Sequence, residues 1–256
     1  MEEVSWAMGR LVRGVALLAI VAQGCAAVRI EPEMPVPLPG PMASQKGRPG
    51  LVIGAPHGRS DAGTDRIGLD LARRTGFGLV VATYADLDAG HRRLNVNRPT
   101  EGVQGGAPSQ EVSTEQAREA YEAYIGRVEE VSQGPLHLYV ELHGNGRKES
   151  AGRIEIATVG LSQEDAWQLR TLLELLRDAH LRGRPESPRL DVLVEPLDRV
   201  YYTASAVKQA GVLRLTARAI HIELPRVART LGREAYTDVL ADFLTQAASL
   251  PLARGQ

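Results

Sequence analysis

Four side chains that can bind a metal ion or move a proton follow or end strand-like stretches of this sequence. They are His57, Asp61, His143 and Glu223. Two imidazoles and one carboxylate can form a catalytic zinc site that keeps a fourth position for water. Zinc lowers the pKa of that water towards ~7, and a further carboxylate is then needed to pass its proton to a leaving amine. Glu223 is the candidate for that step, since it lies in an apolar strand where its charged head must find a polar partner.

Strands that alternate with helices must position these residues. Short apolar or alternating runs predict strands over residues 51–55, 78–84, 136–142, 153–159, 190–194 and 219–224. Helical patterns are found over residues 67–72, 114–131, 163–176, 205–211 and 233–248, with Thr64 or Asp65, Ser113 or Thr114, and Ser162 as expected N-caps. This order predicts an α/β fold: a single domain with a mainly parallel, mixed sheet that is flanked by helices on both faces.

The edge of the sheet at which the strands end is the expected site. In such a fold, ligands bind beyond the carboxyl ends of the strands. Gly144 and Gly146 flank Asn145 and predict a sharp turn straight after His143. That turn would leave the histidine pointing into the crevice at the strand ends.

The composition is that of an ordinary globular protein. The chain has 256 residues, of which 43% are hydrophobic and 24% charged, enough for one sizeable core. The formal net charge of -1 gives no reason to expect nucleic acid binding, and 4% aromatic residues argue against base-stacking platforms. A serine hydrolase is not favoured, because the sequence lacks a Gly-x-Ser-x-Gly elbow.

The N-terminal residues resemble those of a bacterial lipoprotein. Residues 8–22 are basic and then apolar over the length of a signal peptide, and Cys25, the single cysteine, follows. We therefore expect a signal peptide over residues 1–25 with lipidation at Cys25, a proline-rich tether over 26–50 and the α/β domain over 51–256. Met8 is an alternative start. An uncleaved anchor is the alternative to lipidation, but the run is shorter than the about 20 residues of a membrane-spanning helix. The expected location is the bacterial cell envelope, at the outer membrane in a Gram-negative cell.

Four motifs resemble those of N-formylglutamate amidohydrolases and phage-type poly-γ-glutamate hydrolases, which belong to the zinc-carboxypeptidase-like superfamily. Residues 57–64 resemble their histidine–acid–glycine–threonine loop, and residues 93–99 their arginine…Asp-Leu-Asn-Arg-Pro signature. Residues 141–144 match an acid-Leu-His-Gly motif, and residues 220–223 stand where the related folds have a catalytic glutamate. Asp61 departs from the more frequent glutamate, and Asn95 from the usual aspartate.

The resemblance implies a role for each matched position. The implied zinc ligands are His57, Asp61 and His143, the implied general base is Glu223, and the implied anchor of a substrate carboxylate is Asn97 with Arg98. Arg93 would help that anchor or polarise the scissile carbonyl. The resemblance thus implies a Zn²⁺-dependent amidohydrolase that cleaves an amide next to a free carboxylate in an N-acyl amino acid, a γ-glutamyl compound or a cell-wall peptide. Other divalent ions also fit such ligands.

Each residue also has a structural explanation when it is taken alone. Asp61 is typical of a turn or cap, and Glu223 of a strand-end acid that is paired with Arg226. His221 lies on the same strand face as Glu223, and we expect it to be a packed histidine, with a supporting contact or a ligand role left open. The alternative function is a non-catalytic envelope lipoprotein that holds carboxylate-bearing peptides with Arg98. The sequence indicates no partner beyond the substrate and the lipid anchor, and it leaves the oligomeric state unknown.

Overall fold

The computed structural model describes residues 42–58, 60–83, 94–103, 105–107 and 110–250, which lie within one compact unit over residues 34–256. Cys25 and Arg93 lie outside the described residues, as do the expected signal peptide and most of the expected tether. Among the helices that are described, none has the length and apolar character needed to cross a membrane.

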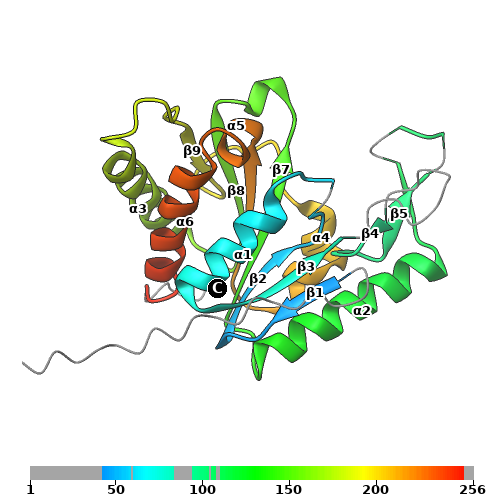
Figure 1. Cartoon of the computed structure of the whole chain (residues 1–256). Helices are drawn as coiled ribbons and strands as arrows, with labels where there is room; N and C mark the ends of the chain where they lie inside the picture. Colours follow the sequence, from blue (N-terminus) through cyan, green and yellow to red (C-terminus); the bar gives the residue numbers. More distant parts are fainter. Residues whose placement is uncertain (1–41, 59, 84–93, 104, 108–109, 251–256) are drawn as a thin grey trace, which may run out of the picture. The chain divides into compact units, whose positions relative to one another are not determined.

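A seven-stranded sheet with the order β1-β3-β2-β7-β10-β8-β9 forms the centre of this unit (Figure 1). Its strands are β1 (Met42–Gln45), β2 (Arg48–Ala55), β3 (Phe77–Ala82), β7 (Leu138–Asn145), β8 (Arg153–Val159), β9 (Asp191–Val194) and β10 (Ala219–Pro225). The adjacent strands β3, β2, β7 and β10 are parallel, whereas β1 and β8 run antiparallel to their neighbours β3 and β10. The predicted fold class, a mainly parallel mixed sheet with helices, is confirmed.

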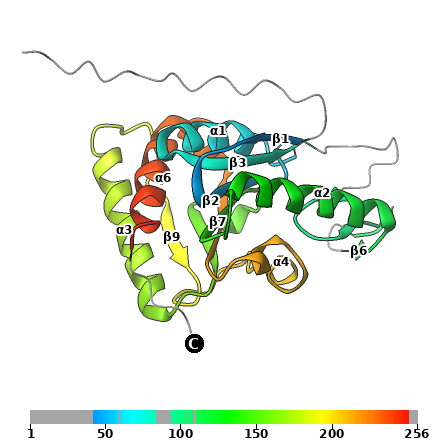
Figure 2. The ribbon, with the colours of Figure 1, turned by 90° about the horizontal axis from the view of Figure 1, so that it is seen from below.

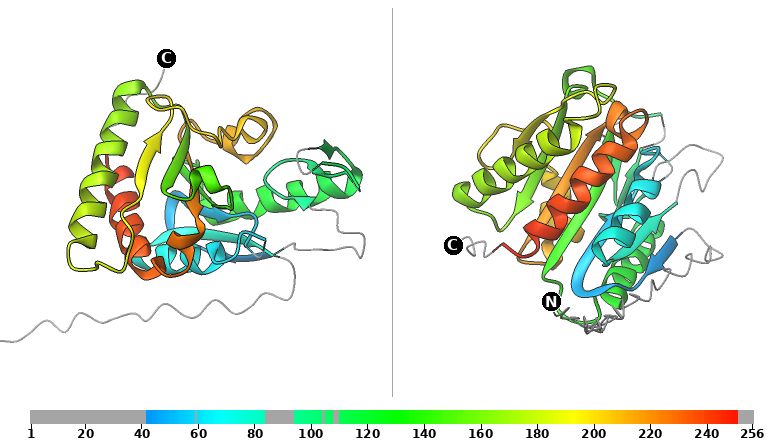
Figure 3. Two further views of the ribbon diagram at one scale, coloured as in Figure 1. Left: turned by 90° about the horizontal axis from the view of Figure 1, so that it is seen from above. Right: turned by 60° about the vertical axis from the view of Figure 1, so that its left-hand side comes forward.

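Helices cover both faces of the sheet (Figure 2). One face carries α1 (Thr64–Thr75), α3 (Gln163–Leu181) and α6 (Arg233–Ala247), which lie side by side (Figure 3). The other carries α2 (Glu115–Ser132), with α4 (Ser205–Ala210) and the 3-10 turn η2 (Val212–Leu215) packed near its strands. Because helices cover both faces of the sheet, side chains on both faces are buried. This explains why β2 and β3 are continuous apolar runs.

The alternation along β7 and β10 separates the core from the site. Leu138, Val140 and Leu142 of β7 join the core under α1, α3 and α6, as do Ile220 and Ile222 of β10. Every second residue of a strand points to the opposite face. That opposite face carries the polar members of the two strands, among them Glu141, His143 and His221.

The helix starts follow capping chemistry in two of the three predicted cases. Ser162 and Asp165 form a reciprocal capping box at the start of α3, and Thr114 accepts a hydrogen bond from the Ala117 N–H at the start of α2. The cap predicted for the first helix is wrong. Thr64 is already helical, and its hydroxyl donates to the Asp61 carbonyl, while Gly63 occupies the cap position with a φ of 93°.

Two further expectations are corrected. The sheet begins at Met42 rather than near Leu51, because residues 42–45 pair with β3 as an edge strand instead of belonging to the tether. The turn expected straight after His143 is also absent. β7 continues through Asn145, and Gly144 is a strand residue without a positive φ.

Between β3 and α2 the chain forms a second, small sheet. It consists of β4 (Leu94–Asn95), β5 (Thr100–Gly102) and β6 (Glu111–Val112) in that order. Its short strands hold the Asn97–Arg98 pair next to the carboxyl edge of the large sheet. The remaining described elements are the 3-10 turn η1 (Lys148–Ser150) and α5 (Arg226–Arg229), which follows β10 directly.

Candidate metal centre and active site

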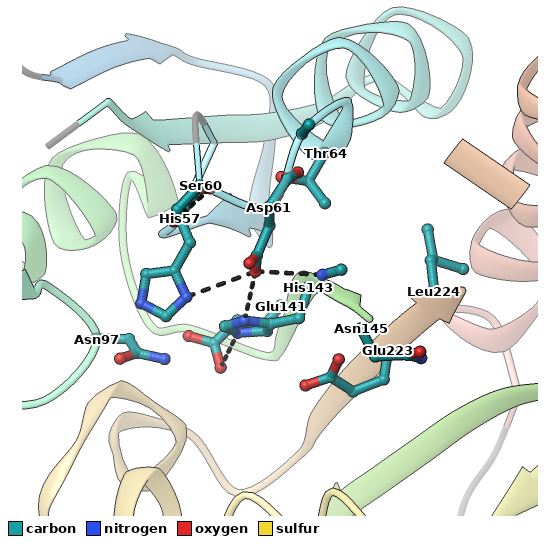
Figure 4. A network of polar contacts seen from close by, with 12 residues as sticks. His57, Ser60, Asp61, Thr64, Asn97, Glu141, His143, Asn145, Glu223 and Leu224 are labelled. Atoms are coloured by element: carbon teal, nitrogen blue, oxygen red, sulfur yellow. Dashed lines mark hydrogen bonds and ion pairs between the residues drawn. The ribbon is translucent and has the colours of Figure 1, made fainter. Parts of the chain in front are cut away.

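The carboxyl ends of two adjacent parallel strands, β2 and β7, bring the predicted metal ligands together. His57 follows β2, Asp61 lies in the loop that leads to α1, and His143 lies near the end of β7. The Nδ1 atoms of His57 and His143 lie 3.5 and 3.3 Å from the same Asp61 oxygen, Oδ2 (Figure 4). The backbone N–H of Gly144 also donates to this oxygen, at 3.1 Å. The three side chains predicted as ligands therefore meet at one point.

Beside these three residues, the strand register aligns a second row of polar side chains. Glu141 of β7 lies opposite His221 of β10, and His143 lies opposite Glu223. Glu141 Oε2 lies 2.9 Å from His221 Nδ1 and 3.2 Å from His143 Nε2. His221 Nε2 in turn lies 3.2 Å from Glu223 Oε1. His221 is therefore not the merely packed histidine that we expected, since its two nitrogens join two buried carboxylates.

The two contacts of Glu141 differ in kind. The contact with His221 has the geometry of a hydrogen bond. The contact with His143 is close but lacks the geometry of a hydrogen bond. His143 Nε2 is therefore held mainly by electrostatic attraction. Both place a carboxylate behind an imidazole. This arrangement is common behind metal-binding histidines, where it fixes the tautomer and the orientation of the ring.

Burial and charge compete in this cluster. Burial alone would raise the pKa of Asp61, but hydrogen bonds and charges from His143 and His57 hold that pKa far below its usual range. Burial would likewise raise the pKa of Glu141, and His143 and His221 hold it down. For His143 burial acts to lower the pKa, but Asp61, Glu141 and Glu223 raise it to about 10. Without a metal ion, the buried acids are therefore balanced by a protonated imidazole.

A divalent metal ion fits the His57–Asp61–His143 group. Zinc binds imidazole and carboxylate at about 2.0–2.2 Å, which in a tetrahedral site separates neighbouring ligand atoms by about 3.4 Å. The distances of 3.3 and 3.5 Å from Asp61 Oδ2 agree with this spacing. A group formed by Glu141, His143 and His221 also has suitable atom types. Its hydrogen bond of 2.9 Å and complete burial of Glu141 are better explained by support of the neighbouring ligands.

A cavity of about 360 Å³ opens next to this group. Its lining includes His57, Asp61, His143, His221 and Glu223, together with Asn97, Arg98, Asn145, Tyr202 and Ser205. Glu223 is only 6% exposed, yet it lines the cavity, as an acid–base residue must. Burial, followed by the charge of Glu223, raises the pKa of Tyr202 to about 12, so that its hydroxyl is a hydrogen-bond donor at neutral pH.

The predicted carboxylate anchor is nearby but is occupied within the chain. Arg98 lines the cavity, and its guanidinium forms a two-bonded pair with Glu111, with Nε 2.9 Å from Oε2. Asn97 is completely buried; its side-chain oxygen accepts from Arg98 and its backbone oxygen from Val212. Asn97 therefore positions Arg98 and η2. Arg93, the remaining predicted site residue, lies outside the described part of the chain.

Three site features were missed by sequence reasoning. Glu141 was quoted only as part of a motif and His221 was expected to be packed, although polar residues at every second position of both strands signal a polar face. The third is Gly144, where the absence of a side chain leaves room for a neighbouring residue and does not serve a turn. A Cβ there would lie 2.4 Å from Cζ of Arg229. No sequence pattern marks Arg229, because only the fold brings α5 against β7.

Comparison with known proteins gives matches in solved structures alone. No family model matches the sequence, and no curated protein does. A bacteriophage poly-γ-glutamate hydrolase is similar over 81% of this chain and 87% of its own, with 13% identity and a TM-score of 0.42. The zinc-free form of YndL is similar over 79% and 88%, with 13% identity and a TM-score of 0.45. A metallo-carboxypeptidase from Burkholderia cenocepacia is similar over 80% of this chain but 59% of its own, with 9% identity and a TM-score of 0.42.

These neighbours include proteins of the kind that the sequence motifs resemble. At identities of 9–13% and TM-scores of 0.42–0.45 these similarities carry no argument about function. The residues of the cavity therefore carry the functional assignment.

Proposed function

We propose that this chain is a metal-dependent hydrolase, with zinc as its ion, that cleaves an amide bond in a small acyl-amino-acid or peptide substrate. The observation that supports this most is the convergence of His57, Asp61 and His143 beside Glu223 in one cavity. Burying several ionisable side chains together lowers the stability of the fold, because desolvation penalises every ionised side chain. Such a cluster is therefore better explained by a function than by packing. Perturbed ionisable groups in a cavity favour a functional site.

His57, Asp61 and His143 would hold the ion, which supplies Lewis acidity by polarising a carbonyl oxygen and lowering the pKa of water. Glu223 Oε1 faces His221, and Oε2 would take a proton from the attacking water. The same carboxyl group then donates this proton to the departing amine. One water and one amide thus give one carboxylic acid and one amine.

The preference for an amide next to a free carboxylate rests on Arg98. A planar guanidinium suits a carboxylate because it forms two parallel charge-assisted hydrogen bonds. Glu111 makes this arrangement with Arg98, and Thr100 supports it by donating to Glu111 Oε2 at 2.8 Å. A substrate carboxylate would have to replace Glu111. The Arg98–Glu111 pair has the two-bonded geometry that a substrate carboxylate would adopt, and Glu111 would compete with that carboxylate.

The experiment compares wild type with Glu223→Gln on N-formyl, N-acetyl and γ-glutamyl substrates, with and without a chelator. We expect the variant to retain bound metal and to lose about 10²–10⁴-fold in kcat, the usual contribution of a general acid–base group. Glu174→Gln on α3 is the matched control, because Glu174 is paired with Arg170 at the surface. An active Glu223→Gln enzyme, or hydrolysis that is insensitive to the chelator, would show that the assignment is wrong.

We also propose that the protein is attached to the bacterial cell envelope through lipid on Cys25. The proposal depends on the sequence around this cysteine, which lies outside the described residues. Labelling cells with a radioactive fatty acid should label the wild-type protein and leave Cys25→Ser unlabelled. Equal labelling of the two would contradict lipidation at this residue.

A further inference from the structure

Arg229, at the end of α5, binds the backbone of three separate segments at once. Its Nε donates to the Leu224 carbonyl at 3.1 Å and its Nη2 to the Asn145 carbonyl at 3.2 Å. Its Nη1 donates to the carbonyl of Ala62. A single guanidinium thus joins the end of β10, the end of β7 and the loop that precedes α1.

The three carbonyls lie next to the residues of the proposed metal centre. Leu224 follows Glu223, Ala62 follows Asp61, and Asn145 comes two residues after His143. We propose that Arg229 is a positioning residue that fixes the three segments of the metal centre relative to one another and thereby sets its affinity for the metal ion. This inference rests on the proposed function, because it requires that the residues which Arg229 positions bind a metal ion.

A side chain at position 144 would displace the guanidinium of Arg229 from its three carbonyl contacts. A Cβ on Gly144 would lie 2.4 Å from Cζ and 2.7 Å from Nε of Arg229, closer than any real contact. The backbone N–H of this glycine also donates to Asp61 Oδ2. The guanidinium of Arg229 therefore packs directly against Gly144, the residue whose backbone N–H links β7 to the Asp61 carboxylate.

The location of Arg229 distinguishes positioning from substrate binding. The described residues that line the cavity at the metal centre do not include Arg229. It lines a different cavity, of about 540 Å³, together with Gly58, Ala62, Gly63, Asp65, Arg66, Thr230 and Arg233. It therefore acts from behind the loop that carries Asp61.

The shape of the guanidinium is as important as its charge. Its planar fork can serve three carbonyls in fixed directions, whereas the single ammonium of a lysine on a flexible stem cannot keep all three. Its charge also faces Asp61 and Glu223: burial lowers the pKa of Arg229, and these two acids oppose that shift. Replacement by lysine would keep the charge and lose the fork, which separates the two contributions.

The test measures zinc affinity on the full chain. Metal-free wild type, Arg229→Gln, Arg229→Lys and Gly144→Ala are titrated with Zn²⁺ against a chromophoric chelator, and the Co²⁺ absorption spectrum of each reports the ligand geometry. Arg233→Gln is the matched control, since Arg233 lines the same rear cavity but pairs with the half-buried Asp70 at 3.2 Å. Thermal unfolding in the presence of EDTA reports whether each variant is folded.

We expect Arg229→Gln, Arg229→Lys and Gly144→Ala to weaken zinc binding by about 10–100-fold, the usual effect of losing a residue that orients metal ligands. Their Co²⁺ spectra should change, whereas Arg233→Gln should keep the wild-type affinity and spectrum. If Arg229→Gln does not fold, Arg229→Lys and Gly144→Ala decide the question. Wild-type affinity and spectra in these folded variants, or equal weakening by Arg233→Gln, would overturn the inference. Absence of zinc binding by wild type would overturn the proposed function as well.

Discussion

His143 combines two contacts that a single imidazole can make only in one orientation. Its Nδ1 faces Asp61 Oδ2 at 3.3 Å and its Nε2 faces Glu141 Oε2 at 3.2 Å, while its ring stacks on that of His221 at 4.3 Å. The Glu141 carboxylate favours a proton on Nε2 and so leaves Nδ1 as the nitrogen for a metal ion. The orientation of this residue is therefore set before any ion binds.

A pH effect follows from the charge balance at His143. Its pKa is raised to about 10 in the metal-free protein, so that at pH 7 the imidazole holds a proton that a metal ion must displace. We expect zinc binding at pH 7 to release protons and zinc affinity to rise with pH up to about pH 10. Calorimetry in buffers of different ionisation heat measures the release. A binding heat that does not depend on the buffer would contradict this prediction.

The pair formed by Arg98 and Glu111 leads to a second residue-level prediction. If Arg98 is the anchor of a substrate carboxylate, removing the competing charge by Glu111→Gln should lower KM for carboxylate substrates without lowering kcat. Arg127 and Glu130 form a surface pair on α2, and Glu130→Gln there is the control. An unchanged or higher KM in Glu111→Gln would show that the pair supports the small sheet only.

At the scale of elements, Gly54 of β2 leaves room for two tyrosine side chains, Tyr124 of α2 and Tyr139 of β7. The hydroxyl groups of Tyr124 and Tyr139, which are hydrogen bonded at 2.9 Å, occupy that space. A Cβ on Gly54 would lie 2.1 Å from the Tyr139 oxygen and 2.5 Å from the Tyr124 oxygen. The tyrosine pair thereby packs over β2, the strand that leads to His57, and links α2 to β7.

We therefore expect Gly54→Ala to lower the free energy of unfolding by about 1–3 kcal/mol, because the added methyl group overpacks a completely buried site. Gly126→Ala is the control: position 126 lies within α2 and a Cβ there meets open space, so that a gain of up to about 1 kcal/mol is expected. Urea unfolding measures both. Equal stability of Gly54→Ala and wild type would show that the tyrosine pair moves aside without cost.

The elements themselves were largely predictable from the sequence, and the reasons are local. The apolar runs of β2 and β3 and the capping box at Ser162 are visible in the order of the residues. The edge strand β1 was not, since it follows a proline-rich segment and shows its strand character only when it pairs with β3. The turn after His143 was wrong for a related reason: Gly144 provides room for Arg229, which comes from a distant segment.

At the scale of the whole molecule, the parallel order of β2, β7 and β10 is what gathers the site. Parallel strands place their carboxyl ends at the same edge, so that residues separated by more than a hundred positions meet there. The sequence predicted the members of the proposed metal group but not the contacts behind them. Those contacts, from Glu141, His221 and Arg229, depend on strand register and on the position of a short helix, which no local pattern encodes.

The content of bound metal tests the central claim most directly. Wild-type protein that is purified without a metal-affinity tag should contain about one zinc ion per chain, and His143→Ala should lose it while remaining folded. Arg184→Ala, which removes one of the two ion pairs of the half-buried Asp238, serves as the control and should keep the ion. Wild type without near-stoichiometric metal, or His143→Ala with an undiminished amount, would contradict the proposal that these residues form a metal centre.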